Sequence, residues 1–123
     1  MDERITTIQH KGKEILSVDF SNLKGEEVVA LIQQIPEATE RLSELLILVD
    51  GTNSRGSMES MAAFKDIFAE LGLDEHAAGT MKAAGIGASG LGKILFDGLV
   101  RLSPIPMRAF GSRAEALDWL AEE

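Results

Sequence analysis

Two overlapping glycine patterns contain the residues of this sequence whose types and spacing most suggest chemistry. Gly85, Gly87 and Gly90 have the spacing G-x-G-x-x-G, while Gly87, Gly92 and Lys93 have the spacing G-x-x-x-x-G-K. A glycine turn between a strand and a helix can hold a phosphate, because the free N–H groups at the start of a helix attract anions. The patterns therefore raise the hypothesis of a phosphate site.

The surrounding sequence argues against a nucleotide at this turn. A dinucleotide site needs an acidic residue about 20 positions further on to bind the ribose, but this region offers Arg108 and Arg113. In the second pattern, Ile94 stands where a P-loop has the hydroxyl that binds Mg²⁺. We therefore interpret the glycines first as residues that permit a tight turn and close packing of a helix on the sheet.

The alternative is a small anionic or amphipathic ligand bound at the same turn. Residues 82–113 carry 5 basic and 1 acidic side chains, whereas the whole chain has a net charge of -8. A local positive field of this kind attracts anions. The candidate ligand-binding residues are Asp50, Thr52, Gly87, Ser89, Gly90 and Lys93.

Asp50 belongs to this set because it follows the apolar run "LLILV". The carboxyl end of a central strand is where open α/β sheets often bind ligands. A phosphoacceptor aspartate would need a neighbouring acidic pair, and none is evident, since Asp19 lies late in the second predicted strand. The other interpretation is that the Asp50 side chain caps the polar turn "TNSRG" that follows it.

No other residues form a catalytic or metal-binding pattern. The two imidazoles, His10 and His76, are far apart in the sequence, and neither lies beside a nucleophile in a known motif. A metal site usually needs three or four ligands. We therefore expect a protein that is not an enzyme and has no cofactor and no metal.

The amino-acid composition argues against two classes of protein, membrane-spanning proteins and nucleic-acid-binding proteins. The 123 residues are 45% hydrophobic and include no cysteine, and no apolar run approaches the roughly 20 residues needed to cross a membrane. The net charge of -8 argues against nucleic acid, which binds clustered Lys and Arg. We expect one domain over residues 1–123, cytoplasmic and without a membrane span.

Hydrophobic spacing predicts an α/β fold with the element order ββαβαβαβα and a mixed sheet of about five strands with flanking helices. The pattern predicts a hairpin with its turn at "HKGK" near the start of the chain, and it predicts that "SELLILVDG" forms the central strand. In order, the predicted strands cover residues 3–9, 14–20, 43–51, 80–88 and 103–110, and the predicted helices 24–35, 57–71, 89–102 and 112–123.

The stretch from "LLILVDG" to the end resembles the SpoIIAA-like family of the STAS/SEC14 superfamily. The resemblance rests on "GASGLGK", on the basic and aromatic strand "MRAF" and above all on the closing helix "SRAEALDWL". It covers residues 45–123 well and the N-terminal third only by the order of elements. It implies a small mixed sheet with flanking helices, in a branch with no established enzymatic activity.

Two functions known among relatives follow from this resemblance. Antagonists of anti-sigma factors switch protein partners through a phosphorylated serine at the start of a helix. Ser57 and Ser60 are the nearest hydroxyls here, although the family's Asp-Ser-Ser-Gly motif is missing. SEC14 relatives instead hold a lipid or another apolar molecule.

The predicted helix over residues 89–102 suggests a protein interface. Phe96 and Val100 fall opposite its core-facing residues, and exposed apolar groups often mark contacts. The alternative is that this helix is covered on both sides. We expect a non-catalytic module that binds a protein partner or forms a homodimer.

Overall fold

One five-stranded sheet organises the computed structural model of this chain, in the order β1-β2-β3-β4-β5. β1 is antiparallel to β2, and every other neighbouring pair is parallel. The mixed sheet confirms the predicted α/β class. The strands are β1 (Ile5–His10), β2 (Lys13–Asp19), β3 (Leu46–Asp50), β4 (Lys82–Ile86) and β5 (Met107–Phe110). The structure describes residues 4–40, 42, 44–54, 59, 62–63, 65–67, 70, 81–87, 97, 101 and 106–122.

The β1–β2 hairpin has the predicted tight turn at "HKGK", and each strand reaches one residue nearer to the turn than predicted. His10 pairs directly with Lys13, so only Lys11 and Gly12 form the turn. Both turn residues have positive φ, 50° and 80°. A two-residue turn of this kind matches the twist of the strands it joins. The predicted strand ends were too far from the turn because the sequence marks Gly12 but gives no sign that Lys11 also adopts this conformation.

Two short helices, α1 (Glu26–Ile32) and α2 (Ile35–Thr39), cover one face of the sheet. Pro36 lies in the first turn of α2, where its missing N–H costs nothing. The helical residues Ala63 and Ile67 pack against the same core. The largest side chains buried on this face are Leu16, Val18, Phe20, Leu31, Ile32, Ile35 and Ile47.

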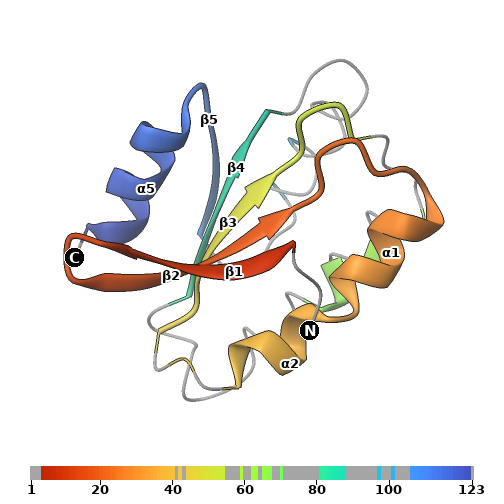
Figure 1. Cartoon of the computed structure of the whole chain (residues 1–123), viewed down its shortest axis with the longest axis horizontal. Coiled ribbons are helices and arrows are strands. Elements are labelled where there is room, and N and C mark those ends of the chain that lie inside the picture. Colours follow the sequence, from red (N-terminus) through yellow and green to blue (C-terminus); the bar gives the residue numbers. More distant parts are fainter. Residues whose placement is uncertain are drawn as a thin grey trace.

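The last helix, α5 (Arg113–Ala121), covers the opposite face, as Figure 1 shows. Its N-cap is Ser112, whose hydroxyl accepts the Glu115 N–H at 3.3 Å and donates to the Glu115 carboxylate at 3.1 Å. The first of these bonds is the N-cap bond of the predicted capping box, while the Glu115 carboxylate accepts from the serine hydroxyl and not from the Ser112 backbone N–H. The buried core on this side consists of Ile15, Leu46, Leu48, Ala84, Ala116 and Leu120.

The end of α5 is tied to the amino-terminal end of the sheet. Lys82 Nζ donates to the carbonyls of Trp119 and Glu122 at 3.3 and 2.7 Å, which satisfies two acceptors at the helix C-terminus. His10 Nε2 lies 2.8 Å from Asp118 Oδ1. α5 therefore runs back along the sheet, with its N-terminus at the carboxyl ends of the strands.

Candidate functional site

Three of the predicted site residues meet at one corner of the sheet. Asp50 ends β3, Gly87 directly follows β4, and Thr52 lies in the turn after Asp50. The Thr52 N–H and hydroxyl donate to Asp50 Oδ1 at 3.0 and 2.6 Å. The Asp50 side chain therefore caps its own turn, which is the second of the two interpretations that the sequence allowed.

Gly87 packs directly against Thr52. Its φ of 78° favours glycine, and a Cβ added there would overlap Thr52 Oγ1. The same Cβ would lie 2.8 Å from Thr52 N and 3.0 Å from Thr52 Cα, which are backbone atoms that cannot easily yield. A backbone hydrogen bond of 2.8 Å from Gly51 N–H to the Ile86 carbonyl joins the two segments. No room for a side chain remains between Gly87 and Thr52.

A residue that the sequence analysis set aside, Asp19, lies next to this corner. Asp19 ends β2 and is the register partner of Asp50 on the neighbouring parallel strand. Partners in such a register direct their side chains to the same face of the sheet. No acidic pair beside Asp50 is evident from the sequence, but the pairing of the strands places one acidic residue, Asp19, in that position. Only the pairing of β2 with β3 reveals the alignment, because 31 positions separate the two residues in the sequence.

The Asp19 carboxylate is held by its own loop. Burial raises its pKa, but hydrogen bonds from Ser21 and the charges of Arg4 and Arg113 outweigh that effect and leave the pKa below its ordinary value of 3.8. The Ser21 N–H donates to Asp19 Oδ1 at 2.8 Å. Arg4 Nη1 lies 3.8 Å from the same oxygen. Asp19 is therefore ionised and already partnered, as expected of a carboxylate that shapes a loop.

The two loops at this edge are joined to each other. The Asn22 N–H donates to the Thr52 carbonyl at 3.0 Å, and the Phe20 N–H donates to the Asp50 carbonyl at 2.8 Å. Asn22, Thr52 and Asn53 are exposed. The carboxyl edge of β2 and β3 thus ends in a hydrogen-bonded, polar rim.

The remaining predicted site residues lie outside the residues that the structure describes. Their predicted roles remain predictions: ligand binding for three of them, phosphorylation for two and a protein interface for two. They are Ser89, Gly90 and Lys93, then Ser57 and Ser60, then Phe96 and Val100.

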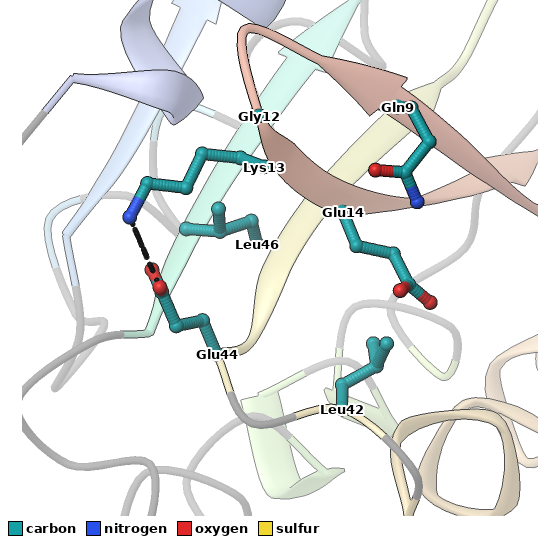
Figure 2. Close-up of a pocket in the computed structure, with 7 residues that line it drawn as sticks. All are labelled: Gln9, Gly12, Lys13, Glu14, Leu42, Glu44 and Leu46. Atoms are coloured by element: carbon teal, nitrogen blue, oxygen red, sulfur yellow. Dashed lines mark hydrogen bonds and ion pairs between the residues drawn. The ribbon is translucent and has the colours of Figure 1, made fainter.

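The structure also contains a hollow at the opposite end of the sheet, which the sequence did not indicate. It has a volume of about 230 Å³ and lies beside the hairpin turn and the start of β3. In Figure 2, Lys13 points toward Glu44, and Lys13 Nζ lies 3.0 and 3.3 Å from the two carboxylate oxygens. The lining residues are Gln9, Gly12, Lys13, Glu14, Leu42, Glu44 and Leu46. Because its lysine is neutralised by a neighbour, this hollow offers no free cation to a ligand.

The described residues show no site for a metal and no membrane-spanning helix. Across the placed part of the chain, no three His, Cys, Asp or Glu side chains gather closely enough to hold an ion. In the same part, no helix is both long and apolar enough to cross a bilayer. Among these residues, every buried side-chain nitrogen and oxygen has a hydrogen-bond partner.

Comparison with known proteins decides the family. The sequence profile of the SpoIIAA-like family matches residues 15–121. The chain belongs to the SpoIIAA-like family. The match begins within β2 and includes α1 and α2, and so extends the resemblance seen in the sequence into the N-terminal third.

A solved structure supports the same fold. The chain is similar to an uncharacterized protein of the DUF3478 family with a SpoIIAA-like fold, from Shewanella loihica PV-4. The two are 22% identical, with a TM-score of 0.65 over 95% of this chain and 92% of the other. At this identity, the likeness shows the SpoIIAA-like fold alone. No curated protein matches the chain significantly.

Proposed function

We propose that this SpoIIAA-like chain is a non-catalytic module that acts by binding another protein, including a second copy of itself. The observation that carries the proposal is the closed corner at Asp50, Thr52 and Gly87. The carboxylate there is used to cap a turn, and the glycine is used for close packing. An exposed, hydrogen-bonded polar rim on a STAS-like fold suits contact with a protein surface better than chemistry on a small substrate.

The alternative function is a small anionic or lipid-like ligand at the glycine-rich turn. The basic segment 82–113 favours it. The described residues next to the glycine-rich turn disfavour such a ligand. Among the placed residues, no cation forms an ion pair with the Asp50 carboxylate, which lies beside this turn. A carboxylate at the site repels a phosphate or a fatty-acid headgroup.

Native mass spectrometry of freshly purified protein separates the two functions. We expect ions of one chain and of two chains, each with the mass of the polypeptide alone. A stoichiometric additional mass that disappears on denaturation would contradict the proposal and support the ligand. Adding inorganic phosphate or a fatty acid before the measurement, and following the melting temperature in parallel, provides the matched test for each ligand class.

A further inference from the structure

Among the described strands, β1 has a partner strand along only one of its two edges. It is the first strand in the sheet order and pairs only with β2 among the strands that the structure describes. Thr6, Thr7 and Gln9 are exposed. Figure 1 shows β1 at the margin of the sheet, in red, with β2 on its inner side. An unpaired edge presents a row of N–H and C=O groups that another strand can bind.

The hairpin register identifies which backbone groups point outward. The Asp19 N–H donates to the Arg4 carbonyl at 2.9 Å, so Arg4 faces β2. In an antiparallel pair, successive residues face the partner strand and the outside alternately. The N–H and C=O groups of Ile5, Thr7 and Gln9 therefore point away from β2.

These three outward residues are arranged symmetrically about Thr7. If a second copy approaches in the antiparallel sense with Thr7 opposite Thr7, Ile5 of each copy lies opposite Gln9 of the other. All three opposed pairs are then of the hydrogen-bonded kind, so every outward N–H and C=O gains a partner. The opposed threonine side chains also form a favourable cross-strand pair.

Nothing within β1 blocks such pairing. Natural edge strands are often protected by Pro, Lys, inward charges or bulges, whereas the strand reads ITTIQH and pairs with β2 without a bulge. The cations around the hairpin are already paired within the chain, so two copies bring no unpaired cations together. These pairs are Arg4–Asp19, Lys11–Asp118 and Lys13–Glu44, with N···O distances of 3.8, 3.1 and 3.0 Å.

We infer that β1 is the surface through which two copies associate, in an antiparallel register centred on Thr7. The two five-stranded sheets then form one continuous sheet across the dimer. This inference rests on the proposed function, because it names the site of the self-association proposed above. The register centred on Thr7 can be tested separately from self-association as such.

Cysteine crosslinking tests the register directly, since the chain has no cysteine of its own. In the proposed dimer, the Cα atoms of opposed Thr7 residues lie about 5.5 Å apart, within the range that a disulfide spans. The matched control is Gln9→Cys, on the same exposed edge. Two Gln9 residues lie four positions out of register, so their Cα atoms are about 14 Å apart. We expect mild oxidation to crosslink Thr7→Cys much faster and further than Gln9→Cys.

Thr7→Pro supplies a second test. The Thr7 N–H points away from β2, so proline in both copies removes two hydrogen bonds of the dimer and none of the hairpin. Sedimentation should show association roughly tenfold or more weaker, since each copy loses a donor at the centre of the interface. Thr7→Ala keeps the N–H and loses only the cross-strand threonine pair, so it should weaken association much less than Thr7→Pro. Far-UV circular dichroism checks that each variant folds, and if Thr7→Pro does not, the two cysteine variants decide.

Each outcome has a clear meaning. Association that survives Thr7→Pro, or equal crosslinking of the two cysteine variants, would overturn the β1 register while leaving self-association intact. A wild-type chain that stays a single copy at every concentration would contradict the inference together with the self-association on which it rests.

Discussion

The closed corner predicts that Gly87→Ala destabilises the fold far more than an ordinary glycine substitution. Two costs add at this position. A side chain at a φ of 78° costs about 1–2 kcal/mol. The new Cβ also meets Thr52 N at 2.8 Å and Thr52 Cα at 3.0 Å. Overpacking of that kind typically costs a further ~1–3 kcal/mol. We expect a total loss of about 2–5 kcal/mol in the free energy of unfolding, which lowers the melting temperature by roughly 8–20 °C.

Gly12→Ala is the matched control for this prediction. Gly12 has a φ of 80°, almost the same as Gly87, but nothing lies within 4 Å of an added Cβ. It should therefore lose only the conformational part, about 1–2 kcal/mol. The gain from stiffening the unfolded chain is the same for both variants and cancels in the comparison. Urea unfolding followed by circular dichroism measures the difference. Equal losses for the two variants would refute the claim that Gly87 packs tightly against Thr52.

Three further predictions concern the rest of the fold. Ser112→Ala removes the cap of α5 and should lower the free energy of unfolding by about 1 kcal/mol in urea titrations; no change would mean that the capping box contributes nothing. Leu120→Ala empties a fully buried position under α5 and should cost about 2–5 kcal/mol by the same assay; a loss near zero would show that α5 is not packed on the sheet. Because the pKa of Asp19 is lower in the folded than in the unfolded chain, its contribution to stability is complete above its ordinary value of 3.8 and is lost as the pH falls further. Asp19→Asn should therefore flatten the dependence of stability on pH below that value, and an unchanged acid profile would contradict the lowered pKa.

Local signals in the sequence predicted most of the fold. The continuous apolar run identified β3, and the serine and glutamate three residues apart identified the start of α5. Strand alternation around "HKGK" identified the hairpin. These features succeed because each depends on neighbouring residues alone. The strand ends beside the turn were each one residue off because Lys11, the first turn residue, is not a type that usually adopts positive φ.

The site was harder to predict from the sequence because its geometry depends on segments that are far apart in the sequence. Asp50 and Thr52 were chosen as neighbours in one turn, and their hydrogen bonds are local. The contact of Gly87 with Thr52 joins segments 35 positions apart, and only the parallel pairing of β3 with β4 creates it. The alignment of Asp19 with Asp50 depends in the same way on the pairing of β2 with β3. The spacing of residues within one turn can be judged from the sequence, but the residues that lie next to that turn depend on how the strands pair.

The sequence predicted the strand β1 but not its position at the edge of the sheet, for a related reason. The residues of β1 read as an ordinary hairpin strand, and nothing local shows whether a strand lies inside a sheet or at its margin. That position follows only from the order of all the strands. The inference that a second copy binds along β1 therefore depends on the order of the strands and not on the residues of β1 alone.

Sedimentation equilibrium of the untagged full chain over a wide range of concentration tests the central claim, that this protein works by association, most directly. We expect the average mass to rise from that of one chain toward that of two, with a single dissociation constant and no dependence on added phosphate or fatty acid. A mass that remains that of one chain throughout, together with a melting temperature that rises when such a ligand is added, would contradict the account.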